Sequence, residues 1–385
     1  MSATVHYRGL TWDHPRGYNA LAAAAAALDP VQDGLTLSWD RHSLEGFEQH
    51  PIADLCRRYD LIVLDHPHVG EAVAGEGLLP LEDLFDAGEI AAWGRDVIGP
   101  CLRSYHYAGW HWALPLDAAT QVMAVRPDLM DGPVPETWAQ VLDLAARRPV
   151  ALSLAGPHAV LSFQSICTAL GEPPAQADPE LFVGRRTGME ALDLMARLAA
   201  TSPLAVANLN PIGILGAMAA GTEVALCPLI YGYVNYTRAR PGQAPLRFAN
   251  APRQEPGGRP GSTLGGTGIG ISRNARVTPA LLDHLRWLMA PGTQAGFIPD
   301  HDGQPSLRGA WADPGVNGRW GDFYCATADT LENAFVRPRH PGAIAFQTAA
   351  SAVIRMALSD RRPHADIIDD LQSLYTASRR PGMER

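Results

Sequence analysis

The first part of the chain alternates short apolar runs with longer segments of helical periodicity. Apolar runs at residues 5–11, 35–39 and 59–64 predict strands, and the segments at 17–28 and 52–58 predict helices. Strands that alternate with helices of this length are typical of a parallel α/β sheet. We therefore expect an α/β fold, with ligands at the edge where the strands end.

The pattern changes after residue 109. Two apolar runs at 110–115 and 121–125 predict strands on either side of a turn, and a helix is expected to begin at Pro135. Beyond it the pattern predicts a second lobe and a helical C-terminus, with strands at 150–154, 224–229 and 246–248, and helices near 159–170, 188–199, 213–219, 280–289, 342–358 and 365–376. The helix at 280–289 has Thr278 as a predicted N-cap and Pro279 at its first position.

Polar and aromatic residues follow two of the predicted strands. Trp12, His14 and Arg16 come after the first strand, and the turn at 65–68 comes after the third, with Asp65, His66 and His68. An indole offers a stacking surface, a guanidinium pairs with a carboxylate in two-pronged geometry, and imidazole serves as acid or base near neutral pH. These side chains are the predicted ligand-binding residues, against the alternative of a capped turn with polar surface groups.

Composition narrows the classes of function. The chain has 385 residues, 46% of them hydrophobic, which suits two or three lobes with a sizeable core. A net charge of −9 argues against a nucleic acid or an anionic membrane surface as partner. All 31 basic residues are arginines, so a Schiff-base lysine and a P-loop lysine are both excluded.

No cofactor or metal is expected. The five cysteines are widely spaced without a CxxC motif, and the His66–His68 pair lacks a third ligand at a recognisable spacing. The glycines at 265–270 fit no phosphate-loop spacing, so they are interpreted as hinge and close-packing residues. Cys227 stands near a strand end, where it is either a nucleophile or an ordinary buried cysteine.

Four segments, in order, resemble the extracellular solute-binding proteins of ABC importers, in the large group that includes sugar binders. They are WHWALPLDAATQVM at 110–123, PETWAQVL at 135–142, MAAGTEVAL at 218–226, and GGTGIGIS at 265–272 followed by LRWL at 285–288. In the third segment Thr222 stands where the family usually has a lysine.

The resemblance implies a two-lobed, hinge-linked periplasmic-binding-protein-like clamshell of type II. Its N-terminal α/β lobe would be 1–115 plus 265–315 and its second lobe 120–260, with a C-terminal helical segment at 316–385 packing across both. A small polar solute would bind in the cleft between the lobes. The ligand contacts would include Asp117 at the hinge crossing and Tyr231 and Tyr233 in the second lobe, and an ABC permease would be the partner if the chain is exported.

Residues 1–4 lead directly into a strand, with no basic or apolar signal region. The sequence as written therefore predicts a cytoplasmic protein, and a periplasmic or extracellular one only if the true start or export route differs. The alternative function is a cytoplasmic enzyme on the same fold, with His14, Asp65 or His66 as general acid or base. A ligand sensor that reports to a partner is the third possibility.

Overall fold

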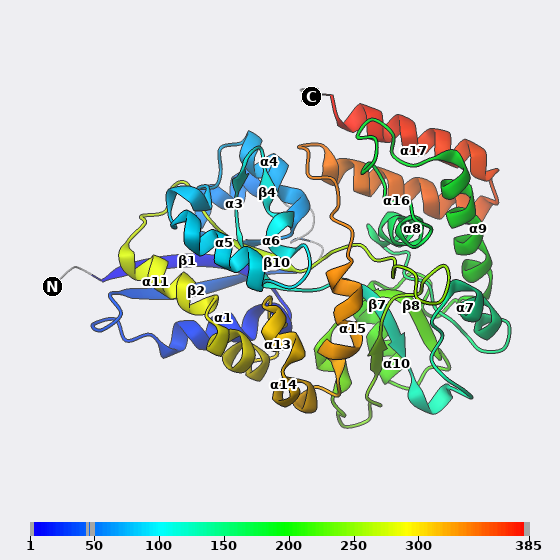
Figure 1. Ribbon diagram of the computed structural model, residues 1–385, viewed down its shortest axis with the longest axis horizontal. Helices are drawn as coiled ribbons and strands as arrows, with labels where there is room; N and C mark the ends of the chain where they lie inside the picture. Colours follow the sequence, from blue (N-terminus) through cyan, green and yellow to red (C-terminus); the bar gives the residue numbers. More distant parts are fainter. Residues whose placement is uncertain (1–3, 44–45, 47–50, 381–385) are drawn as a thin grey trace. The chain divides into compact units, whose positions relative to one another are not determined.

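The computed structural model describes residues 4–43, 46 and 51–380, and the chain divides into two compact units (Figure 1). Unit 1 comprises residues 1–119, 265–319 and 339–341, and unit 2 comprises 120–264, 320–338 and 342–385. The chain therefore passes from one unit to the other five times, after residues 119, 264, 319, 338 and 341.

Unit 1 is built on a five-stranded sheet with the strand order β2-β1-β3-β10-β6. Its strands are β1 (Val5–Trp12), β2 (Leu35–His42), β3 (Leu61–Leu64), β6 (Leu114–Asp117) and β10 (Thr267–Ile271), with a separate ribbon of β4 (His106–Tyr107) and β5 (Trp110–His111). Its helices are α1 (Pro15–Ala27), α3 (Ile52–Arg58), α4 (Val69–Ala74), α5 (Ala87–Asp96), α6 (Cys101–Ser104), α11 (Pro279–Leu288), α12 (Ile298–Asp300), α13 (Arg308–Ala312) and α14 (Pro314–Arg319). Short turns of helix lie at η1 (His66–His68), η2 (Leu81–Asp83) and η5 (Thr293–Phe297).

The sheet of unit 1 is mixed, whereas the sequence pattern predicts a parallel one. Strand β1 pairs in parallel with β2 and with β3, as the alternation of strands and helices requires. Strand β10 enters between β3 and β6 and is antiparallel to both. The difference arises because β10 comes from a later part of the chain, which returns from unit 2 and is not joined to β3 by a crossover helix.

Unit 2 has a three-stranded antiparallel sheet with the order β8-β7-β9. Its strands are β7 (Gln121–Val125), β8 (Leu226–Tyr231) and β9 (Arg247–Ala249), and its helices are α7 (Trp138–Ala145), α8 (His158–Ala169), α9 (Arg185–Thr201), α10 (Pro211–Ala219), α15 (Phe323–Glu332), α16 (Ala343–Asp360) and α17 (His364–Ser378), with short turns at η3 (Pro127–Leu129) and η4 (Val234–Thr237). The predicted strand at 150–154 is not formed, and only Val150 bridges to Leu226.

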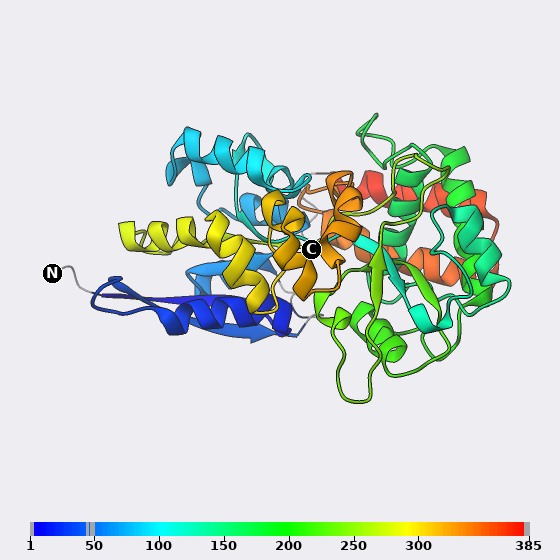
Figure 2. The ribbon, with the colours of Figure 1, turned by 60° about the horizontal axis from the view of Figure 1, so that its bottom comes forward.

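The core of unit 2 surrounds α8, every residue of which is buried. The C-terminal helices α16 and α17 pack on each other and on α8 and α9, as the orange, red and green ribbons of Figure 2 show. Phe182, Phe346 and Tyr375 meet there in one aromatic cluster, with ring centroids 4.9 to 5.4 Å apart. Helices α15, α16 and α17, from the C-terminal part that the resemblance sets apart as a segment of its own, thus lie within unit 2, whereas α14 lies in unit 1.

Local signals place several helices as predicted. The hydroxyl of Thr278 accepts from the Leu281 N–H at 3.2 Å and caps α11, with Pro279 in the first turn. Thr137 and Gln140 form a capping box at the start of α7, which begins at Trp138, three residues after the predicted start at Pro135. The α/β class of the fold is confirmed.

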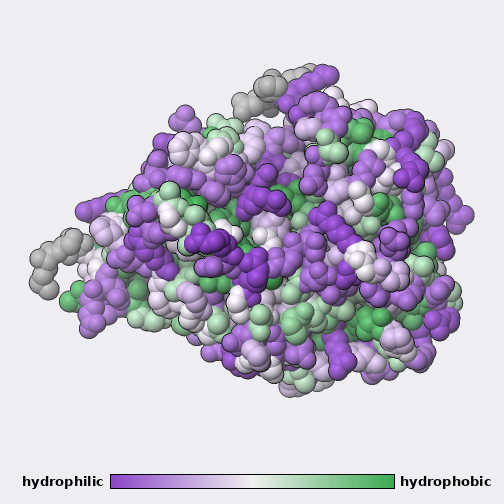
Figure 3. All heavy atoms as spheres, viewed as in Figure 1, coloured by the Kyte–Doolittle hydropathy of each residue, from purple (hydrophilic) through white to green (hydrophobic). Residues whose placement is uncertain are grey.

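Exposed large apolar side chains are few and scattered over both units. On the face drawn in Figure 3, hydrophobic residues lie between hydrophilic ones. The most exposed, among the described residues, are Val31, Trp110, Val134, Leu181, Met189, Leu204, Trp287 and Met356. None of the helices in the described part of the chain combines the length and the hydropathy that a membrane crossing requires.

Candidate functional site

In unit 1 an ion pair with two hydrogen bonds joins Arg16 to Asp117. Arg16 lies in the first turn of α1, and Asp117 is the last residue of β6. The guanidinium donates from Nε to Oδ1 at 2.9 Å and from an Nη to Oδ2 at 2.5 Å, and both side chains are about 95% buried. The sequence predicts that Arg16 pairs with a ligand carboxylate. In the structure its guanidinium makes this two-pronged contact with the carboxylate of Asp117 instead.

Trp12 and His14 form a stack beside this ion pair. The two rings lie 5.2 Å apart at 8° to each other, and the Arg16 guanidinium lies 5.3 Å from the indole. Gly17 permits the arrangement, because a Cβ there would come within 2.0 Å of the Trp12 Nε1. The imidazole thus covers the indole, and of the two rings it is His14 that is partly exposed.

The orientation of His14 follows from its place at the start of α1. It is the N-cap residue, and its Nδ1 accepts a hydrogen bond from the Arg16 N–H at 3.1 Å. In a neutral imidazole the proton then resides on Nε2. The N–H donor of a neutral His14 ring is then on Nε2, and such a donor is what a hydroxyl or carbonyl oxygen requires.

Asp65, His66 and His68 follow β3, and they differ in exposure. Asp65 is partly exposed and caps the short helix η1 by accepting from the His66 N–H at 2.9 Å. The Nδ1 of His66 lies 3.2 Å from an Asp65 oxygen, while its ring is wholly buried and meets Tyr105 edge-on. His68 is also buried. Of the three, only Asp65 reaches the surface.

Sheet topology brings these two groups to the same edge. Strand β1 pairs in parallel with β3, so Trp12 and Asp65 both lie where neighbouring strands end. Asp117 is joined to the same end of the sheet through Arg16 and through β10, on which Thr267 lies opposite Asp117. Gly266 precedes β10 with φ +79°, and a Cβ there would meet the Asp117 carbonyl oxygen at 2.3 Å, so only glycine fits.

In unit 2 the predicted aromatic residues follow β8. Tyr231 is its last residue and is partly exposed, whereas Tyr233 is about 95% buried at the start of η4. The Tyr231 ring meets the imidazole of His158 edge-on, with centroids 5.9 Å apart.

His158 is a candidate that the sequence pattern does not indicate. It begins α8, and its Nδ1 has no hydrogen-bond partner among the described residues. Burial, together with the nearby positive charges of Arg337 and Arg355, lowers the pKa of His158 to about 3. The ring is therefore neutral at pH 7. The only signal in the sequence is a lone histidine before an apolar helix, which commonly marks an ordinary core residue.

Cys227 is buried in β8, and burial raises the pKa of its thiol to about 12, so the thiol stays protonated at neutral pH. Among the described residues, no three His, Cys, Asp or Glu side chains lie close enough together to hold a metal ion.

The arrangement of elements is that of the solute-binding proteins of ABC transporters, as comparison with solved structures shows. One is a solute-binding protein of Agrobacterium radiobacter K84 in complex with ribitol, which has 20% identity and a TM-score of 0.79 over 97% of this chain and 99% of that one. Another is maltose-bound MalE3 of T. maritima, with 16% identity and a TM-score of 0.80 over the same shares. A third, from Thermotoga lettingae TMO, is bound to α-D-tagatose, with 16% identity and a TM-score of 0.75 over 98% and 100%. At these identities the likeness establishes the fold. No protein-family model matches the sequence, and none of the curated proteins does.

Proposed function

We propose that this chain binds a small polar organic solute, as the solute-binding component of an ABC importer. The observation that carries the proposal is the fold, which is shared over at least 97% of the chain with proteins whose structures contain ribitol, maltose or tagatose. The ligands of these neighbours are rich in hydroxyl groups, which need both donors and acceptors in the site.

The side chains of each unit supply that chemistry. In unit 1, His14 offers a donor and Asp65 an acceptor, and both are partly exposed. In unit 2, Tyr231 offers a partly exposed aromatic ring backed by the neutral His158. In unit 1 we propose His14 and Asp65 as direct contacts, which the buried Trp12, Arg16, His66, His68 and Asp117 would hold in place. In unit 2 we propose Tyr231 as a contact, with the buried Tyr233 two residues further along the chain.

Enzymatic use of the same residues is the alternative. The contact between Asp65 and the His66 Nδ1 resembles an oriented general base, but the His66 ring is wholly buried and does not reach a solute without rearrangement. Binding without turnover therefore agrees better with the geometry. An ABC permease as partner, and a place outside the cytoplasm, belong to the same proposal.

The test is calorimetric titration with ribitol, maltose and tagatose, followed by mass spectrometry of a wider pool of polyols and sugars. We expect saturable binding of at least one compound, which is released unchanged when the protein is denatured. Consumption of a compound in many-fold excess over protein would establish the enzyme instead. Absence of any retained or consumed compound would overturn both.

Variants then test the residues. His14→Ala and Asp65→Ala should weaken binding of the identified solute by roughly tenfold or more, since each removes a hydrogen bond of about 1.4 kcal/mol. His106→Ala is the matched control, because His106 is an exposed histidine of the same unit outside this group. Circular dichroism spectra should be unchanged in all three. Wild-type affinity in both test variants would remove these residues from the site.

A further inference from the structure

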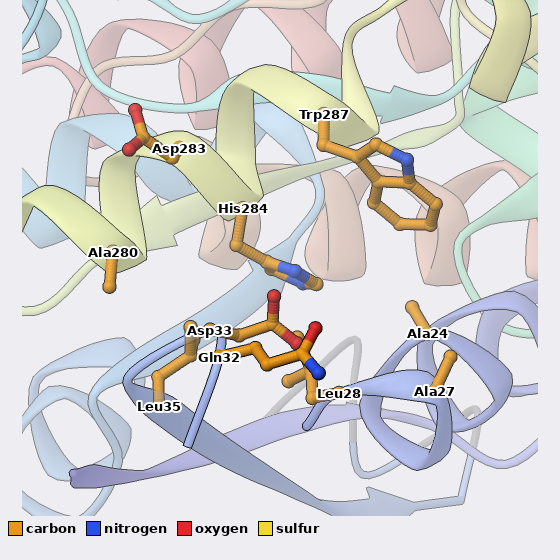
Figure 4. A pocket seen from close by; sticks show the side chains of 10 residues that line it. All are labelled: Ala24, Ala27, Leu28, Gln32, Asp33, Leu35, Ala280, Asp283, His284 and Trp287. Atoms are coloured by element: carbon orange, nitrogen blue, oxygen red, sulfur yellow. The ribbon is translucent and has the colours of Figure 1, made fainter. Parts of the chain in front are cut away.

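A pocket lies in unit 1, at the C-terminal end of α1. It is a groove of about 600 Å³ between the last turns of α1, the loop that leads into β2, and helix α11 (Figure 4). Arg16 begins the same helix, and at 1.5 Å per residue Ala27 lies roughly 16 Å further along its axis. The groove is therefore separate from the residues proposed above to contact the solute.

One wall of the groove carries a polar group without a partner. His284 projects from α11 towards Gln32 and Asp33 of the loop, as Figure 4 shows. Its side chain is 93% buried, and its Nε2 forms no hydrogen bond within the described residues. A buried nitrogen of this kind costs free energy unless a ligand or water satisfies it. Burial lowers the pKa of His284 to about 4, so the ring is neutral at pH 7 and one nitrogen is an acceptor.

The charge at the groove is negative. Asp33 faces His284 across it, and one Asp33 oxygen accepts from the Asp29 N–H at 2.7 Å. Asp283 also lines the groove, where it pairs with Arg286 at 2.9 Å. No arginine is among the lining residues, so an entering group meets carboxylates and a neutral imidazole. This combination favours a cation that can donate hydrogen bonds.

The remaining walls are apolar. Ala24, Ala27 and Leu28 of the α1 end face the indole of Trp287, which is one of the most exposed large apolar side chains of the described residues, at 39%. The Trp287 ring stacks on His284 with centroids 5.7 Å apart. An exposed indole beside a carboxylate provides a cation–π surface as well as apolar contact area.

We infer that this groove binds a small organic cation, namely an alkyl- or arylammonium whose apolar body packs between α1 and Trp287 and whose ammonium group lies at Asp33 and His284. The site is independent of solute binding by the residues around His14 and Asp65. A cation bound there would contact both α1 and α11, which belong to the same unit.

The experiment uses 2-phenylethylammonium as the probe on the full chain at pH 7.5, with calorimetry and tryptophan fluorescence as readouts. Neutral 2-phenylethanol and anionic 3-phenylpropanoate share its apolar body and differ in charge. We expect saturable binding of the ammonium and affinity at least about tenfold lower for the other two. Equal binding of the alcohol would overturn the assignment of the ligand class, and no saturable binding of the ammonium would overturn the site.

Variants locate the binding. Trp287→Ala and Asp33→Asn should each lower the affinity for 2-phenylethylammonium at least tenfold. The controls are Trp110→Ala and Asp193→Asn, which change an exposed tryptophan and an exposed aspartate elsewhere and should leave this affinity unchanged. Asp33 and Trp287 are both exposed, so neither change threatens the core. Undiminished affinity in either groove variant, with wild-type circular dichroism, would place the cation elsewhere and overturn the inference.

Discussion

Arg16 and Asp117 form a buried two-pronged ion pair that ties the first turn of α1 to the last residue of β6. Two charges removed from water depend on each other, because neither has solvent to replace its partner. The pair therefore fixes the start of α1, and with it the Trp12–His14 stack, at the end of the sheet.

Removal of one charge of this pair should be costly. We expect Asp117→Asn to lower the free energy of unfolding by about 3 kcal/mol, since a buried guanidinium then lacks its counter-charge. Urea unfolding followed by circular dichroism measures the change. Asp369→Asn removes a partner of the exposed Arg185 and should cost less than about 1 kcal/mol. A similarly small decrease in the free energy of unfolding for Asp117→Asn would show that the buried pair does not stabilise the fold to this extent.

A methyl group at Gly17 should disturb the stack without harm to the helix. The added Cβ of Gly17→Ala would overlap the Trp12 indole, which must move, while alanine itself favours α1. We expect an altered near-ultraviolet circular dichroism spectrum and at least about tenfold weaker solute binding. Gly88→Ala is the control, because a Cβ at Gly88 of α5 meets nothing within 4 Å. An unchanged spectrum for Gly17→Ala would contradict the packing described.

His158 should make the protein less stable in acid. Burial and the charges of Arg337 and Arg355 lower its pKa to about 3, whereas a histidine of the unfolded chain titrates near 6.5. Between these values the unfolded state holds one proton more than the folded state, so the free energy of unfolding falls as the pH falls. His158→Phe should therefore flatten the fall between about pH 6 and pH 4, by up to about 1.4 kcal/mol per pH unit.

The comparison for His158→Phe is urea unfolding at several pH values, alongside the wild type. His284, whose pKa is also lowered by burial, contributes a fall of the same sign to both proteins and cancels in the difference. His106→Ala, which changes an exposed histidine of the other unit, is measured beside His158→Phe as the control variant. Parallel curves for His158→Phe and wild type would mean that His158 is protonated in the folded state.

The thiols should react in two classes. Cys56, Cys101, Cys167 and Cys227 are buried and Cys325 is exposed. Burial raises the pKa of the Cys56, Cys167 and Cys227 thiols, which further suppresses the reactive thiolate. A disulfide reagent should titrate one thiol in the folded protein and all five in denaturant, and none in folded Cys325→Ser. A second fast thiol in the folded wild type would contradict the burial of the other four.

The elements that the sequence predicts well are those whose local signals suffice. Helix α3 lies at Ile52–Arg58 as predicted, and α11 begins at its Thr278 cap. The predicted strand at 110–115 is instead divided between β5 and β6, and β10 joins strands far from it in the sequence. Pairing of this kind depends on contacts between distant segments, which hydrophobic periodicity does not encode.

The same limit applies to the candidate site. The position of Trp12, His14 and Asp65 after strands is readable from the sequence, because strand ends in such sheets collect at one edge. The sequence does not reveal that His14 stacks on the indole, because this depends on the rotamers of the two side chains. Nor does it reveal that Arg16 pairs with Asp117, because this partner lies 101 residues away. His158 could not be found at all, because its burial beside Tyr231 comes from tertiary packing alone.

The repeated passage of the chain between the two units dictates the order in which a newly made chain can fold. Strand β3 leaves the ribosome early, but its neighbour β10 follows only after residues 120–264. The central sheet of unit 1 therefore cannot be completed until most of unit 2 has been synthesised. Unit 2 in turn lacks α16 and α17 until residue 378 has been synthesised. Such distant pairings fold slowly and leave apolar edges uncovered meanwhile. Nascent chains of this protein should therefore need protection from aggregation until helix α17 has been released.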